Sequence, residues 1–136
     1  MKYLLDTDAV SLARKAEGSP FGDWIARQPI GDLAISAITL LELDIGVRRA
    51  ERKDARGGAR LRLWLDGAVI PMFEGRILPV DERVARAAAG MHVPDPAPDM
   101  DSLIAATALA YGLTLVTGNV KDMRRTGVAL LDPSQM

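Results

Sequence analysis

The chain has 136 residues, no cysteine and one histidine, so disulfides are excluded and a zinc site of the usual kind is disfavoured. Its net charge of −1 does not mark the whole surface as a nucleic-acid binder. This length suits one domain, and we expect residues 1–136 to form a single one, with any metal ion held by oxygen ligands.

The N-terminus and the longest uncharged stretch both bear on location. Three residues separate Lys2 from Asp6, which leaves no room for a secretory signal. Residues 102–120 carry no charge, but Gly112 divides them and a strand-like segment follows. We therefore expect a cytoplasmic protein without a membrane span.

The predicted elements alternate between short apolar strands and helices. The strands are expected at residues 2–5, 33–36, 76–79, 113–116 and 128–131. The helices are expected at residues 9–15, 20–27, 38–52, 60–73, 82–91 and 99–111, with Gly57-Gly58 as the break between the third and the fourth. This alternation predicts an α/β fold with a central parallel sheet flanked by helices.

Acidic residues stand at the ends of several predicted elements. Asp6 follows an apolar strand, and Asp101 lies in the first turn of a helix, on the stripe that should face the sheet. Each has a structural alternative, because a helix N-terminus favours a carboxylate as a cap or a dipole partner. Asp8 and Asp99 fit that capping role better. Glu42 is surrounded by apolar residues and needs a partner, either a metal site or an arginine.

Two polar residues follow the fourth predicted strand. Asn119 and Asp122 are expected to project from the same edge of the sheet, although Asn119 also suits a cap for the turn at residues 120–125. His92 is alone at a helix end and is expected to have a surface or C-capping role. If Asp6, Glu42 and Asp101 converge, a divalent cation relieves their repulsion and supplies the activated water that phosphodiester hydrolysis requires. Oxygen ligands point to Mg²⁺, with Mn²⁺ as a possible substitute.

Four segments in order resemble a known family. They are Leu4-Leu5-Asp6-Thr7-Asp8-Ala9-Val10, Ser36-Ala37-Ile38-Thr39-Leu40-Leu41-Glu42-Leu43, Asp101-Ser102-Leu103-Ile104-Ala105-Ala106-Thr107-Ala108 and Leu115-Val116-Thr117-Gly118-Asn119-Val120-Lys121-Asp122. Together they are similar to the PIN-domain toxins of the VapC type, over essentially the whole chain.

The resemblance implies a PIN-like three-layer sandwich and a magnesium-dependent ribonuclease that is the toxin of a type II toxin–antitoxin pair. Asp6, Glu42 and Asp101 match the family's three acids, and its fourth position falls on Asn119, with Asp122 close behind. Of these, we assign Asp6 and Asp101 to the metal. The chain departs from the usual pattern at Asp8, Gly118 and Met123, where asparagine, arginine and phenylalanine are common. Gly118 matters most, because a lost arginine affects RNA contacts.

Two other functions compete. Asp6-Thr7-Asp8-Ala9-Val10 also fits the D-x-D-x-[TV] motif of haloacid-dehalogenase-like phosphatases, with Asp6 as nucleophile and Asp8 as general acid. That class matches the segment at residues 118–122 poorly and leaves Glu42 and Asp101 unexplained. The other alternative is a non-catalytic module that binds RNA or protein through an inert acidic pocket.

The segment from Arg48 to Arg62 is rich in basic residues and reads either as a solvated helical face or as an arm that holds phosphates. The predicted helix pair at residues 38–73 has more apolar residues than one small core can bury. We therefore expect a homodimer that also binds a cognate antitoxin through these helices, in addition to its RNA substrate.

Overall fold

The computed structural model describes all residues, 1–136, and places a parallel sheet at the centre of the molecule. The strand order is β3-β2-β1-β4-β5, and every neighbouring pair is parallel. The strands are β1 (Tyr3–Leu5), β2 (Leu33–Ser36), β3 (Ile77–Leu78), β4 (Thr114–Val116) and β5 (Leu130–Leu131). The α/β sandwich predicted from the alternation of elements is confirmed.

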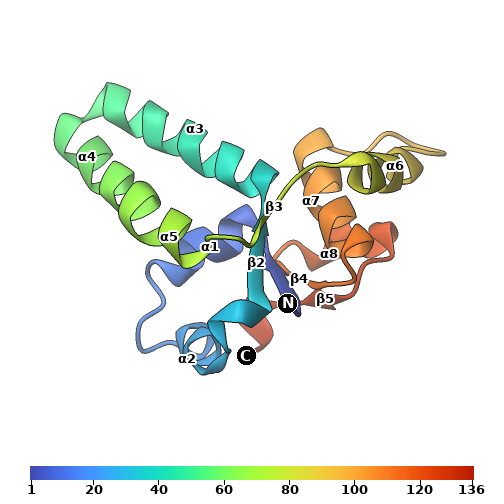
Figure 1. Ribbon diagram of the computed structural model, residues 1–136, viewed down its shortest axis with the longest axis horizontal. Helices are drawn as coiled ribbons and strands as arrows, with labels where there is room; N and C mark the ends of the chain where they lie inside the picture. The colour runs from blue at the N-terminus through green and yellow to red at the C-terminus, as the bar shows by residue number, and fades with distance from the viewer.

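Helices cover both faces of this sheet. They are α1 (Thr7–Ala13), α2 (Pro20–Arg27), α3 (Ala37–Lys53), α4 (Ala55–Trp64), α5 (Ile70–Met72), α6 (Glu82–Met91), α7 (Asp99–Ala110) and α8 (Val120–Met123). Successive residues of β1 serve opposite faces: Leu5 packs with α1, α2 and the α3–α5 segment, whereas Leu4 packs with α7. Figure 1 shows α3 and α4 projecting together to one side of the sheet, opposite α6 and α7.

The break between α3 and α4 lies at Asp54, and the expectation that Gly57-Gly58 separates two helices is wrong. Asp54 ends α3 and caps α4, accepting a hydrogen bond from the backbone N–H of Arg56. Both glycines lie inside α4. A Cβ at Gly58 would stand 2.3 Å from Cα of Glu51, so this position needs glycine because the two helices approach each other closely. After α4 a wide turn at Leu65–Val69 leads into α5.

The helix starts explain how acids come to one edge of the sheet. Asp6 follows β1 directly and caps α1 by accepting from Ala9 N at 2.7 Å, while Ser36, the last residue of β2, caps α3. Asp6, and not Asp8, is therefore the cap of α1. At the start of α7 the expected cap, Asp99, is the first helical residue and makes no side-chain cap hydrogen bond. The carboxyl ends of neighbouring parallel strands meet at this edge, where α/β folds build their sites.

Candidate active site

A small pocket at this edge of the sheet is lined almost entirely by oxygen-bearing side chains. Its volume is about 80 Å³, and its lining residues are Asp6, Thr7, Asp8, Glu42, Asp101 and Ile104. The pocket thus brings together three acids that are far apart in the sequence, one each from the start of α1, from α3 and from the first turn of α7. Asp8 joins them as a fourth carboxylate.

Asp6 is the most enclosed of these acids, with 6% of its surface exposed. Burial raises the pKa of its carboxyl, and the nearby negative charges of Asp8 and Asp101 raise it further, whereas the Thr117 hydroxyl and the Ala9 N–H oppose the rise. Because Oδ1 accepts the Ala9 hydrogen bond, Oδ2 takes no part in capping the helix.

Asp101 faces the same pocket from α7 and is half-buried. Partial burial raises the pKa of this carboxyl, and the charges of Asp8 and Asp122 raise it further. The buried residues that follow, Ile104, Ala105 and Ala108, hold this face of α7 against the sheet. Asp6 and Asp101 therefore both disfavour their charged forms unless a cation lies between them.

Glu42 has neither the full burial nor the arginine partner that its apolar surroundings suggested. Its side chain is half-buried, and Oε1 accepts a 2.5 Å hydrogen bond from the hydroxyl of Thr7. The same hydroxyl lies 3.4 Å from that of Thr39. Thr7 is not among the site residues predicted from the sequence, although it follows Asp6 directly. Its place in the first turn of the helix that follows β1 is the sequence signal that could have identified Thr7 as a site residue.

Asn119 and Asp122 occupy other positions. Asn119 follows β4, and its backbone N–H donates to the Thr117 hydroxyl at 3.0 Å, but its side chain neither caps α8 nor lines the acidic pocket. Asp122 lines an adjoining hollow of about 380 Å³ that shares Asp101 with the acidic pocket. His92 ends α6 as its C-cap residue and pairs with Ser102, which ties the proline loop to α7.

The donor chemistry of the acidic pocket fits a hard divalent cation. Its acidic groups are carboxylates, and no cysteine or histidine lies among them. In this structure no group of three acidic or histidine side chains is spaced closely enough to hold an ion together. The donor set and the raised pKa values of Asp6 and Asp101 thus fit a divalent cation.

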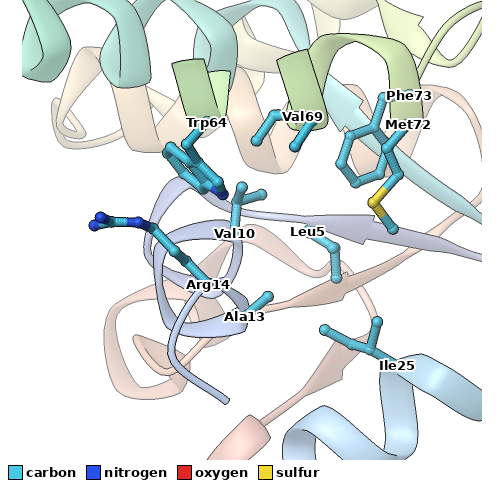
Figure 2. A pocket seen from close by; sticks show the side chains of 10 residues that line it. Leu5, Val10, Ala13, Arg14, Ile25, Trp64, Val69, Met72 and Phe73 are labelled. Atoms are coloured by element: carbon cyan, nitrogen blue, oxygen red, sulfur yellow. The ribbon is translucent and has the colours of Figure 1, made fainter. Parts of the chain in front are cut away.

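An apolar pocket of about 190 Å³ opens on the other side of α1. Figure 2 shows Trp64, Val69, Met72 and Phe73 on one side of it. Opposite them lie Val10 and Ala13 of α1, Arg14 just after this helix, Leu5 and Ile25. The Arg14 guanidinium lies 5.5 Å from the centre of the Trp64 ring. Part of the apolar surface expected on the 38–73 helices thus faces this pocket, while Leu63 is 74% exposed.

Every helix falls short of the length and apolarity that crossing a bilayer requires.

The PIN domain family matches residues 3–128. The chain is 33% identical to the toxin FitB of Neisseria gonorrhoeae and 32% identical to a VapC ribonuclease of Sinorhizobium fredii, over 96% of each chain. The FitAcB structure from N. gonorrhoeae superposes with a TM-score of 0.84 at 30% identity, covering 98% of this chain and 99% of that one. The chain belongs to the PIN-domain family and, within it, to the group that contains the VapC and FitB toxins.

Proposed function

We propose that this chain is a divalent-metal-dependent endoribonuclease and the toxin of a type II toxin–antitoxin pair. The observation that carries the proposal is the pocket where Asp6, Glu42 and Asp101 meet, with the pKa of Asp6 and of Asp101 raised. Relatives named as a ribonuclease and as a toxin support a nuclease, and the neighbouring FitAB and VapBC complexes support an antitoxin partner.

Asp6 and Asp101 would hold the ion, Mg²⁺ by preference. When bound, such an ion lowers the pKa of a coordinated water and polarises a phosphate oxygen. Asp6 is suited to this role because its Oδ1 is fixed by the helix cap, which orients the remaining oxygen. Glu42, oriented by Thr7, would position the attacking water and accept its proton. Asp122 lines the hollow that adjoins the acidic pocket, and it or Asn119, which follows β4, would contact the RNA or complete the ion's ligands.

Of the two competing functions, the family match argues against the phosphatase but not against the non-catalytic binding module. Membership of the PIN-domain family removes the basis for the haloacid-dehalogenase reading, and Asp6 shares its pocket with Glu42 and Asp101, which that reading leaves unused. An inert binding module has the same fold and the same acids. Only a measurement of cleavage separates it from the enzyme.

The test is cleavage of single-stranded RNA by the purified protein, with Mg²⁺ and with an excess of chelator. Asp101→Asn should abolish cleavage. Asp99→Asn is the matched control, since it lies at the start of the same helix with a side chain that is 89% exposed, outside the acidic pocket. Cleavage that persists in chelator, or in a folded Asp101→Asn protein, would contradict the proposal.

A further inference from the structure

A further pocket lies between the end of α1 and the α3–α4 turn and is basic. It has a volume of about 350 Å³, and its charged lining residues are Arg14, Lys53, Arg60 and Asp54. None of the three cations pairs with a carboxylate: the ion pairs of this region join Arg48 and Arg62 to other acids. The one acid, Asp54, is engaged in capping α4. With three cations and one carboxylate, the pocket carries an excess of positive charge.

Ion pairing divides the basic segment of the sequence into two groups. Arg62 contacts Asp44 and Glu51 at 3.0 Å and Asp66 at 3.5 Å, so it joins α3 to α4. The Glu51 and Asp44 carboxylates raise the pKa of its guanidinium, which keeps it charged and paired with them. Arg48 likewise pairs with Asp44. Lys53 and Arg60 remain available, whereas Arg52 and Arg56 are exposed but do not line the pocket.

The acidic and the basic pockets lie on one face of α3. Glu42, Gly46 and Lys53 are spaced four and seven residues apart and so fall on one stripe of the helix. Eleven residues separate the two ends of the stripe, which corresponds to roughly 16 Å along the axis. Between them Gly46 is exposed, and a Cβ there would meet nothing within 4 Å. Arg49 falls on the same stripe and is exposed, so the path between the two pockets carries a further cation.

The face of α1 that meets α3 also runs from the acidic pocket to the basic pocket. Thr7, Ser11 and Arg14 share one face of this helix, and the hydrogen bond from Thr7 to Glu42 shows that this face meets α3. Thr7 lines the acidic pocket and Arg14 lines the basic one. Arg14 is also held by its contact with the Trp64 ring, so its charge is kept near the pocket.

We propose that the Arg14–Lys53–Arg60 pocket binds a backbone phosphate of single-stranded RNA, a short distance along the strand from the phosphate that is cleaved at Asp6 and Asp101. This inference rests on the proposed ribonuclease function. Lys and Arg supply sequence-independent contacts to phosphates, and such contacts hold the register of a strand on a protein. The pocket is a binding site, and its residues take no part in the chemistry.

The experiment compares Lys53→Gln/Arg60→Gln with Arg52→Gln/Arg56→Gln, which removes the same charge from the same end of the helix pair but outside the pocket. Binding of a labelled single-stranded RNA is measured in chelator at several salt concentrations. The pocket variant should bind about tenfold more weakly, with a salt slope reduced by roughly 0.7, since each phosphate contact on a single strand contributes about that much. The control variant should keep the wild-type slope, and Lys53→Arg/Arg60→Lys should restore it.

Cleavage separates this site from the chemistry. The pocket variant should raise KM for a long RNA and leave kcat unchanged, because Asp6, Glu42 and Asp101 are untouched. If the wild-type protein cleaves no RNA, the proposed function fails. If the wild type cleaves RNA and the two double variants show the same salt slope, the phosphate site is overturned while the function stands. Loss of antitoxin binding with an unchanged RNA slope would likewise overturn it, by assigning the pocket to an acidic segment of the antitoxin.

Discussion

The hydroxyl of Thr7 donates a 2.5 Å hydrogen bond to Oε1 of Glu42, across 35 positions of sequence. It joins the first residue of α1 to the second turn of α3, at the pocket where Asp6 and Asp101 also lie. Glu42 is thus oriented by a neutral donor, and no arginine pairs with it. A carboxylate that orients water needs such support, because partners behind the reacting groups fix their geometry.

Replacing Thr7 with valine tests this positioning role, since valine keeps the shape and removes the donor. We expect kcat for RNA cleavage to fall roughly ten- to a hundredfold, as for other outer-shell partners, with RNA affinity nearly unchanged. Thr7→Ser retains the hydroxyl and should recover most of the activity. An equal loss in the serine and valine variants would indicate that Thr7 acts through packing alone.

The raised pKa values of Asp6 and Asp101 predict a dependence of stability on pH in the metal-free protein. Between the unfolded pKa near 3.8 and the higher folded value, the native state retains protons that the unfolded state has released. Stability therefore falls as pH rises through this window, and the penalty persists at neutral pH. Asp6→Asn and Asp101→Asn should each raise the chelator-treated Tm at pH 7, and the gain should shrink below about pH 4. A lower Tm for both variants at pH 7 would contradict this account.

The sequence predicted the sheet and most helices because strands and helices here have clear apolar patterns. The helix at residues 82–91 was predicted with its observed bounds, and β2 likewise. The α3–α4 connection was misplaced because two adjacent glycines usually signal a turn. In the folded chain the close approach of α4 to Glu51 uses Gly58, and Asp54 alone makes the break. A contact between two helices is not visible in local sequence.

Gly58→Ala tests the close approach, with Gly46→Ala as the matched control in the neighbouring helix. A Cβ at position 58 would meet the Glu51 backbone at 2.3 Å, whereas one at position 46 meets nothing within 4 Å. Gly58→Ala should cost about 1–3 kcal/mol of unfolding free energy, as overpacking does. Gly46→Ala should stabilise by about 0.5–1 kcal/mol through helix propensity. Denaturant unfolding of both variants measures the difference, and similar effects would mean that α3 and α4 can separate without cost.

The acids of the site were predictable, but their partners were not. Asp6, Glu42 and Asp101 stand out because a carboxylate among apolar residues at an element end needs a reason. The partners of these acids, Thr7 and Thr117, are ordinary hydroxyls whose roles depend on tertiary placement. The basic segment shows the same limit. Sequence shows a run of cations, and only the fold shows that Arg62 is committed to three carboxylates while Lys53 and Arg60 face a pocket.

The apolar pocket beside α1 predicts where an antitoxin segment binds. Trp64 lines it together with Phe73 and Met72, and an aromatic residue in such a pocket is a typical binding hot spot (Figure 2). Trp64→Ala should weaken antitoxin binding by about 2 kcal/mol or more, measured by calorimetry. Leu63→Ala is the control, because this neighbouring side chain is 74% exposed and does not line the pocket. Equal losses in the two variants would place the antitoxin elsewhere on α4.

The last prediction concerns competition between the antitoxin and the metal ion. The acidic pocket lies at the start of α1 and the apolar pocket farther along it, so an antitoxin segment in the apolar pocket can extend a cationic side chain toward Asp6 and Asp101. A guanidinium pairs with carboxylates in a fixed fork and would neutralise the same charges that the ion does. By linkage, Mg²⁺ and antitoxin should then weaken each other's binding by an equal factor.

Antitoxin affinity is measured with chelator and with saturating Mg²⁺, using Asp101→Asn to remove part of the shared site. The variant should lose the magnesium dependence, because the site that couples the two ligands is incomplete. Equal affinities in chelator and Mg²⁺ for the wild-type protein would show that the antitoxin inhibits without entering the acidic pocket.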